Sequence, residues 1–210
     1  MNLKRTVEGY ARAGCAGIML EDQTSPKRCG HTKNKSVVSR EEAYTRIKAA
    51  VDARTAGTDI FILARTDARI IGLEEAITRC KEFRRLGADM TFLEAPLSIE
   101  EMRAYCSQVD GPKMANMLEH GKTPILPGKE LRDIGYVLAA YPLTLLSAAM
   151  KSMVEVLKCL KSGNSAGVES RILPFSETCR LVGFEEYWEE EKRYDTTAPA
   201  EQSKPDAEKS

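Results

Sequence analysis

Chemically reactive side chains gather in one short segment of the sequence, Lys27-Arg28-Cys29-Gly30-His31. Three neighbours of Cys29 can carry positive charge, and such neighbours stabilise a thiolate, the reactive form of cysteine. Gly30 lets the backbone turn tightly at this point. Because most lone cysteines in loops are inert, the residues alone leave a catalytic and a structural role for Cys29 about equally open.

Polar residues also follow short apolar runs elsewhere in the chain: Glu21, Arg65, Asp67, Glu94 and Asn116. If the runs are parallel strands, their carboxyl ends meet on one face and these side chains converge. The acids among them favour a hard divalent cation, and Mg²⁺ with carboxylate and water ligands fits best. Beside a metal, Arg65 would bind a substrate carboxylate through two hydrogen bonds. The plainer alternatives are a structural salt bridge for Arg65, a solvated loop acid for Glu21 and a loop cap for Asn116.

The apolar runs predict five strands, at residues 15–20, 59–64, 90–93, 114–118 and 136–140. Their nearly continuous apolar character is typical of parallel strands that are buried on both faces. Helical patterns separate them, and Ser39-Arg-Glu-Glu42 and Ser98-Ile-Glu-Glu101 have the spacing of capping boxes at helix starts. The alternation of strand and helix predicts a parallel sheet covered by helices.

The expected architecture is an α/β fold of the (β/α)8 TIM-barrel type, which places its active site at the carboxyl ends of the strands. No glycine-rich dinucleotide-binding turn follows any predicted strand, and this disfavours the doubly wound alternative. A full barrel needs eight strands and about 250 residues, whereas this sequence has 210 residues and five readable strands. We therefore expect residues 1–162 to form a partial barrel that lacks its N-terminal strands.

Two further regions follow the predicted barrel. A long helix is expected over about 143–160, and after the flexible joint Ser162–Gly167 a separate helical region covers 168–194, with an amphipathic pattern over 175–193. This region can pack on its own barrel or on a neighbouring copy. Residues 195–210 are polar, contain two prolines and lack periodicity, which predicts a disordered tail.

Composition excludes several partners. Lys and Arg number 31, as do Asp and Glu, so no net charge attracts nucleic acid or an anionic membrane. No apolar run approaches the roughly 18 residues of a membrane span. The six cysteines are scattered and never spaced as CxxC, a pattern that indicates reduced thiols in an intracellular compartment, either cytoplasm or an organelle matrix.

The assembled motifs resemble the isocitrate lyase/phosphoenolpyruvate mutase superfamily. The matching segments occur in the family's order between residue 1 and about residue 160. They are Glu21-Asp-Gln23, Lys27-Arg-Cys-Gly-His31, Ala64-Arg-Thr-Asp67, Phe92-Leu-Glu-Ala95 and Asn116-Met-Leu-Glu119 with Lys122-Thr-Pro124. The segments Phe175-Ser-Glu177 and Leu181-Val-Gly-Phe-Glu-Glu-Tyr-Trp188 are similar to those of members named carboxyvinyl-carboxyphosphonate phosphorylmutase. The 2-methylisocitrate lyases and the petal death protein belong to the same superfamily.

This resemblance implies a barrel that exchanges its last helices between subunits, usually in a homotetramer, with a homodimer as the smaller alternative. It implies Mg²⁺ or Mn²⁺, an α-oxo or α-hydroxy carboxylate substrate and an enolate-type intermediate. By position, Glu21 would help to hold the metal. Cys29 would be the acid/base that protonates the departing enolate.

The remaining roles are carried over in the same way. Four neighbours of Cys29 would shape the loop over the site: Lys27, Arg28, Gly30 and His31. Three strand-end residues would contact the substrate or order the water around the metal: Arg65, Glu94 and Asn116.

The resemblance also narrows the reaction. The carbon–carbon lyases of the superfamily have the cysteine at position 29, and the phosphonate-forming mutases lack it. The 2-methylisocitrate lyase has a substrate-reading arginine where this sequence has Ser147. We therefore expect a Mg²⁺-dependent lyase that acts on a 2-hydroxy or 2-oxo di- or tricarboxylate, with a 2-substituted malate or oxaloacetate favoured over methylisocitrate and Ser147 lining the substrate site.

Two alternatives remain open. One is a phosphoenolpyruvate or carboxyphosphonoenolpyruvate phosphonomutase. The other is an inactive partial barrel, because the family's earlier strand with its Asp-x-Asp metal motif would come before residue 1.

Overall fold

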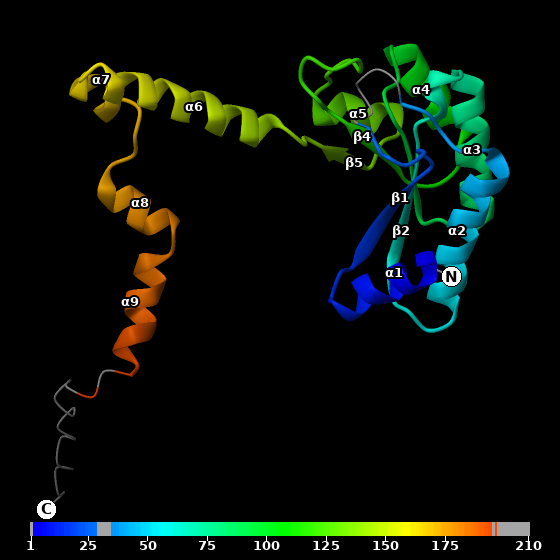
Figure 1. Cartoon of the computed structure of the whole chain (residues 1–210), viewed down its shortest axis with the longest axis horizontal. Helices are drawn as coiled ribbons and strands as arrows, with labels where there is room; N and C mark the ends of the chain where they lie inside the picture. Colours follow the sequence, from blue (N-terminus) through cyan, green and yellow to red (C-terminus); the bar gives the residue numbers. More distant parts are fainter. Residues whose placement is uncertain (1, 29–34, 195, 197–210) are drawn as a thin grey trace, which may run out of the picture. The chain divides into compact units, whose positions relative to one another are not determined.

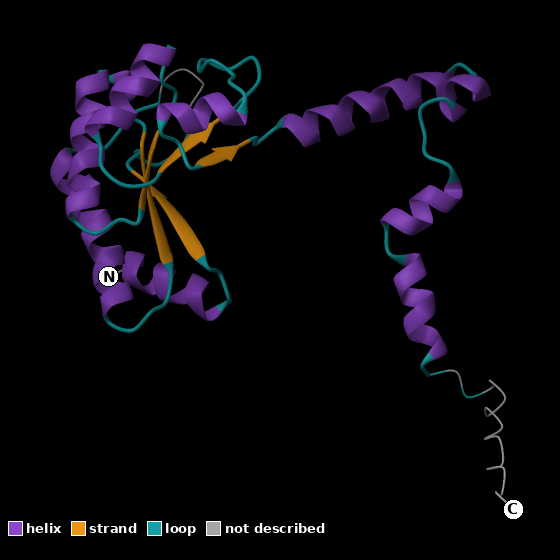
Figure 2. Ribbon diagram, turned by 180° about the vertical axis from the view of Figure 1, so that it is seen from behind, coloured by secondary structure: helices purple, strands orange, loops and turns teal. Residues whose placement is uncertain are grey.

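The computed structural model describes residues 2–28, 35–194 and 196. The chain divides into two compact units, residues 1–148 and 149–210. The first unit contains a sheet of five strands, drawn as orange arrows in Figure 2. The strands are β1 (Gly17–Glu21), β2 (Phe61–Thr66), β3 (Met90–Leu93), β4 (Lys113–Asn116) and β5 (Leu138–Ala140). The helices of this unit are α1 (Asn2–Arg12), α2 (Arg40–Thr55), α3 (Leu73–Arg85), α4 (Ile99–Gln108) and α5 (Gly128–Ile134), with a short 3-10 helix, η1 (Ala68–Ile70).

The five strands lie in chain order, β1-β2-β3-β4-β5, and each pairs in parallel with the next. Successive strands are joined through helices, as in one side of a (β/α)8 barrel. The predicted strands and their parallel arrangement are thus confirmed. Their bounds differ by up to two residues, and β4 ends at Asn116 instead of continuing to residue 118.

Both predicted capping boxes begin helices. The Ser39 hydroxyl accepts a hydrogen bond from the backbone N–H of Glu42 at the start of α2, and the Ser98 hydroxyl accepts one from Glu101 at the start of α4. These bonds satisfy N–H groups that have no partner within the helix. The helix starts are therefore fixed by local sequence.

Helices α2 and α3 cover one face of the sheet (Figures 1 and 2). Ile62 and Ala64 of β2 are fully buried in an apolar cluster with Ile47 and Ala50 of α2 and Phe83 of α3. A second cluster contains Met102 and Tyr105 of α4 and other buried residues around them. Burial of these side chains stabilises the sheet and fixes the orientation of every strand.

The opposite face of the sheet has an apolar layer and a polar layer. Because strand side chains alternate, Arg65 shares this face with Phe61, which is 42% exposed. Met19 of β1 and Leu138 of β5 lie on the same face and are 44% and 48% exposed. Strand pairing sets Glu21 directly beside Arg65 at the carboxyl ends of β1 and β2. The register thus separates apolar residues from the polar strand ends.

The chain continues with α6 (Thr144–Lys161), α7 (Ser165–Glu169), α8 (Phe175–Leu181) and α9 (Phe184–Lys192). The amphipathic pattern over 175–193 forms two helices and not one, because Gly183 adopts a left-handed conformation, φ 85°, between them. The predicted tail at 195–210 lies outside the described residues, except for Thr196. No helix within the described ranges is long and apolar enough to cross a membrane.

Candidate active site

Four of the predicted site residues come together at the carboxyl ends of the strands. The Nε atom of Arg65 lies 3.4 Å from Glu21 Oε2, and its Nη2 atom lies 3.3 Å from Glu94 Oε2. The Asn116 side-chain amide donates a hydrogen bond of 3.3 Å to Glu94 Oε1. The cluster therefore draws one residue from the end of each of the first four strands, as the sequence predicted.

Arg65 is held firmly within this cluster. Its Nε and Nη2 atoms donate to the Asp67 carboxylate at 2.8 and 3.2 Å, and its guanidinium lies 5.2 Å from the centre of the Phe92 ring. Burial lowers the pKa of Arg65, but the hydrogen bond to Asp67 and the charges of Glu94, Asp67 and Glu21 outweigh it and raise the pKa above its ordinary value. Arg65 is a fixed cation facing two further carboxylates.

Asp67 has a different role from the one that its position suggested. Its Oδ1 atom also accepts a hydrogen bond from Lys35 Nζ at 2.8 Å, within a fully buried pair. Burial by itself would raise the pKa of the Asp67 carboxyl. Hydrogen bonds and charges from Arg65 and Lys35 outweigh this effect and hold the pKa below its usual value. With two cations already bound, Asp67 does not join Glu21 and Glu94 in a metal-binding group, and this corrects the expectation of three converging acids. No group of three His, Cys, Asp or Glu side chains in the described part of the chain could hold a metal ion.

Glu21 does fit a cation as one of several ligands. Its Oε2 atom is buried and has no hydrogen bond of acceptable geometry, although Lys27 Nζ lies 2.9 Å away and Arg65 Nε 3.4 Å away. Unlike the buried Lys35 beside Asp67, the Lys27 side chain is 59% exposed, so a cation could replace it. A buried carboxylate oxygen without a hydrogen bond is a hard donor of the kind that Mg²⁺ prefers. Glu21 would therefore supply one ligand, with the others coming from water or from outside the described residues.

The loop after β1 begins close to this cluster. The backbone N–H of Arg28 donates to Gln23 Oε1 at 3.0 Å, and Gln23 pairs with Val37 across the base of the loop. Lys27 reaches Glu21, as described above. The predicted loop residues Cys29, Gly30 and His31 lie outside the described residues. Their roles therefore remain predictions.

Ser147 lies in the first turns of α6 and is exposed. Its backbone N–H donates to the Leu143 carbonyl at 2.7 Å. One turn earlier, the Thr144 hydroxyl donates to Glu119 Oε1 at 2.5 Å and so ties the start of α6 to the loop that follows β4. The side chain of Ser147 makes no hydrogen bond to another described residue, and its predicted contact with substrate remains a prediction.

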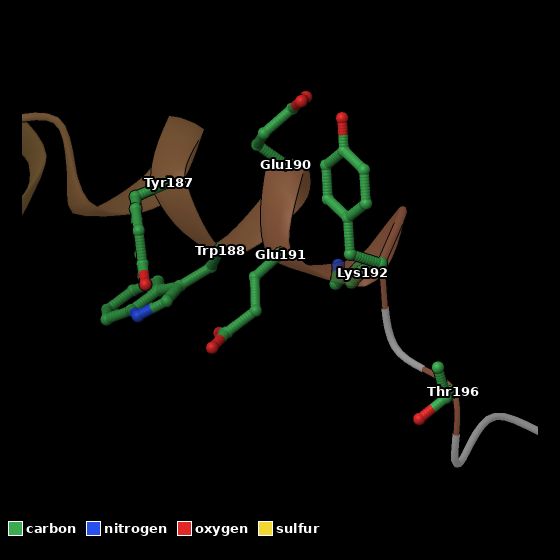
Figure 3. A pocket seen from close by; sticks show the side chains of 7 residues that line it. Tyr187, Trp188, Glu190, Glu191, Lys192 and Thr196 are labelled. Carbon is green, nitrogen blue, oxygen red and sulfur yellow. The ribbon is translucent and has the colours of Figure 1, made fainter.

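A hollow of about 720 Å³ lies along α9 and contains none of the predicted site residues. Tyr187, Trp188 and Glu191 line it, together with residues that follow the helix. Figure 3 shows their side chains spreading from a single helix and its continuation, without convergent polar groups from separate elements. This hollow lacks the arrangement expected of a catalytic site.

Sequence reasoning missed Lys35 and gave no role to Asp22, although both belong to the buried network. Lys35 lies in a polar loop without periodicity, so no local signal pairs it with Asp67. Asp22 is 1% exposed, although it directly follows a predicted strand and begins a polar loop. The alternation of side chains after Glu21 could have indicated that Asp22 faces the opposite side of the sheet.

The family described as phosphoenolpyruvate phosphomutase matches residues 1–161 of this chain. The chain belongs to this family. The phosphoenolpyruvate phosphomutase family lies within the PEP mutase/isocitrate lyase superfamily that the motifs predicted, and that prediction is confirmed.

Proteins similar to this chain are named as a lyase, a phosphorylmutase and an acetylhydrolase. The chain is 42% identical to 2,3-dimethylmalate lyase of Eubacterium barkeri over 198 residues, which cover 93% of this chain and 68% of the relative. It is 39% identical to the chloroplastic carboxyvinyl-carboxyphosphonate phosphorylmutase of Arabidopsis thaliana over 199 residues, or 92% of this chain and 58% of the relative. The structure of oxaloacetate acetylhydrolase with the inhibitor 3,3-difluorooxalacetate matches with a TM-score of 0.83 and 34% identity, covering 94% of this chain and 67% of that one.

This chain thus spans between 58% and 68% of the length of these family members. Its sheet is a five-stranded parallel half-barrel of the superfamily's TIM-barrel type. The cluster around Arg65 lies at the end of the half-barrel where a TIM barrel places its active site.

Proposed function

We propose that this protein is a Mg²⁺-dependent lyase that cleaves a carbon–carbon bond of a 2-substituted malate or an oxaloacetate-type dicarboxylate. The observation that supports this best is the buried Arg65 guanidinium, set between Glu21 and Glu94 at the strand ends. The matched relatives named for 2,3-dimethylmalate and oxaloacetate act on substrates of this chemical class.

Arg65 is the group that would recognise a substrate carboxylate. Its fixed orientation reduces the entropy lost on binding, and because Nε and Nη2 bind Asp67, its Nη1 group is the one that would donate to a substrate carboxylate. Glu94 and Asn116 form a second polar pair, at 3.3 Å, that would orient the substrate or the water around the metal. The chain's own residues therefore bind and orient the substrate.

Glu21 would hold the metal as one of its ligands. Mg²⁺, or Mn²⁺ in its place, would stabilise the negative charge that develops on the substrate oxygens when it is bound. Cys29 would then give its proton to the carbon of the departing enolate, and Lys27, Arg28, Gly30 and His31 would shape the loop that brings it there. A thiol among cationic side chains can hold and release a proton near neutral pH.

Residue 147 bears on substrate size. The serine at this position carries no charge that could bind a third carboxylate, which supports a dicarboxylate over methylisocitrate. A phosphonomutase is the second candidate, because the matching family and one relative bear mutase names. Cys29 favours the lyase. An inactive partial barrel is the third candidate, since the described residues form a sheet of five strands and a TIM barrel has eight.

We also propose a homo-oligomer, a dimer or tetramer, in which the helices after the half-barrel are exchanged between subunits. No residue of α6 is buried, although the helix has many large apolar side chains. Cysteines 15, 80, 106, 159 and 179 are free thiols, which supports a reducing intracellular location in the cytoplasm or an organelle matrix.

The test is release of the 2-oxo acid, pyruvate from 2-methyl-substituted malates or glyoxylate from malates with hydrogen at C2, measured with Mg²⁺ and again after the metal is removed by EDTA. Activity should require the metal. Cys29→Ser should abolish turnover, whereas Cys15→Ser, a matched change outside the site, should leave it unchanged. Full turnover by Cys29→Ser would show that the acid/base is another residue. Stoichiometric Mg²⁺ binding in calorimetry would count against the inactive barrel.

A further inference from the structure

Asp22 is a buried carboxylate that the proposed chemistry leaves without a role. Its Oδ2 atom accepts hydrogen bonds from the Thr66 hydroxyl at 2.6 Å and from Arg79 Nη1 at 3.0 Å. Its Oδ1 atom accepts one from the backbone N–H of Asp67 at 2.8 Å. Both Asp22 and Arg79 are almost completely buried, at 1% and 3% side-chain exposure. Such a carboxylate is fully engaged, and its counter-ion Arg79 also donates to Glu75 Oε1 at 2.8 Å.

Asp22 does not lie on the substrate side of the sheet. Consecutive side chains at the end of a strand point to opposite faces, so Glu21 faces the Arg65 cluster while Asp22 faces Arg79 on α3. Any effect of Asp22 on a ligand bound to Arg65 must therefore pass through other residues.

The route passes through the turn that follows β2. The Thr66 hydroxyl, which donates to Asp22, also accepts a hydrogen bond from the backbone N–H of Ala68 at 3.1 Å. Asp22 thus binds the turn at two points, the side chain of Thr66 and the backbone N–H of Asp67. The carboxylate of Asp67 in turn accepts hydrogen bonds from the Nε and Nη2 atoms of Arg65.

We propose that Asp22, with Arg79 as its counter-ion, is a positioning residue that fixes the Arg65 guanidinium relative to Glu21 through Thr66 and Asp67. An ionised carboxylate suits this task because its two oxygens accept all three hydrogen bonds, whereas an asparagine has only one acceptor oxygen. The identity of the ligand that Arg65 binds rests on the proposed function, whereas the positioning of Arg65 by Asp22 does not.

The direct readout is the exchange of the Arg65 Nε proton with water, measured by NMR on the full chain and assigned by comparison with Arg65→Lys. Thr66→Val removes the hydroxyl and leaves the pair between Asp22 and Arg79 in place. We expect roughly tenfold faster exchange in Thr66→Val and a larger increase in Asp22→Asn. Thr66→Ser, which keeps the hydroxyl, should behave like the wild type. Arg69 Nε, which donates to Glu101 at 2.8 Å, is the internal reference for general loosening of the fold.

The second readout is calorimetric binding of oxalate in the presence of Mg²⁺, where Thr66→Val should weaken binding roughly tenfold and Thr66→Ser should not. If Asp22→Asn does not fold, the comparison of Thr66→Val with Thr66→Ser still tests the positioning role. Unchanged Arg65 exchange in folded Thr66→Val, or equal changes at Arg65 and Arg69, would overturn the positioning role. A wild-type chain that binds no oxalate would count against the proposed function, and the exchange rates would still decide the positioning role.

Discussion

Lys35 Nζ and Asp67 Oδ1 lie 2.8 Å apart, and their side chains are only 2% and 0% exposed. Asp67 is also the partner of Arg65, so one carboxylate balances two buried cations. Removal of one partner from a buried ion pair leaves an uncompensated charge, which is costly in a medium of low dielectric constant. Asp67 is for this reason the most sensitive member of the network.

Asp67→Asn should lower the free energy of unfolding by about 3 kcal/mol, because the buried Lys35 loses its ion pair with Asp67 and Arg65 loses one of the three carboxylates around it. Lys35→Met should cost less, since Arg65 still neutralises Asp67. Urea denaturation followed by circular dichroism measures both values. Equal losses for the two variants would show that the pair of Lys35 and Asp67 accounts for the whole effect and that the contact between Arg65 and Asp67 adds no stability.

Arg65→Lys should weaken oxalate binding in the presence of Mg²⁺ by about 10- to 100-fold, even though the positive charge is kept. Lysine cannot reproduce the two parallel hydrogen bonds that Arg65 makes to Asp67, so its ammonium group would not be held in one orientation. Isothermal titration calorimetry gives the dissociation constant. The matched control is Arg69→Lys, which breaks a similar two-bond pair with Glu101 outside the cluster. An equal loss in both variants would argue against a specific role for Arg65.

The arrangement of Arg65, Glu94 and Asn116 could be predicted because it follows from two general rules. Apolar runs between helices form parallel strands, and the carboxyl ends of such strands meet on one face. Each of these residues lies at the carboxyl end of a strand or directly after it, so their convergence needed no knowledge of loops. The same rules placed Glu21 beside Arg65.

The partners of Asp67 and Asp22 could not be predicted in this way. Lys35 reaches Asp67 because the loop after β1 folds back, with the Val38 N–H donating to the Asp22 carbonyl at 2.8 Å. Arg79 reaches Asp22 because α3 packs on the opposite face of the sheet. Both contacts depend on tertiary packing, which has no periodic signature in the sequence.

Stability should fall on acidification as Glu75 is protonated. Hydrogen bonds from Arg40 and Arg79 lower the pKa of Glu75 to about 2 from an ordinary value of 4.5, against an opposing rise from partial burial. A carboxyl with a depressed folded-state pKa adds stability that is complete above about pH 4.5 and is lost as the pH falls toward 2. Because Arg40 is 48% exposed, solvent screening limits this contribution to about 1 kcal/mol at neutral pH.

Urea denaturation of the wild type and Glu75→Gln at several pH values between 7 and 2 tests this. The difference in unfolding free energy between them should shrink as the pH falls. Glu74→Gln is the control, since Glu74 forms no ion pair in the described part of the chain. A difference that does not change with pH would mean that Glu75 acts by packing and not by charge.

The apolar stripe of α6 should control the oligomeric state. Leu146, Met150, Met153, Leu157 and Leu160 recur at alternating spacings of four and three, which sets them along one side of the helix, and each is more than half exposed. An exposed stripe of this kind is typical of a helix that packs against another subunit. Met153→Lys with Leu157→Lys should therefore weaken association by at least about 100-fold, since each buried side chain contributes about 1.5 to 3 kcal/mol. Sedimentation velocity measures the shift to smaller species, and Ser152→Lys, an added charge at an exposed position beside the stripe, should leave the distribution unchanged. If the double variant sediments like the wild type, α6 does not form the subunit interface.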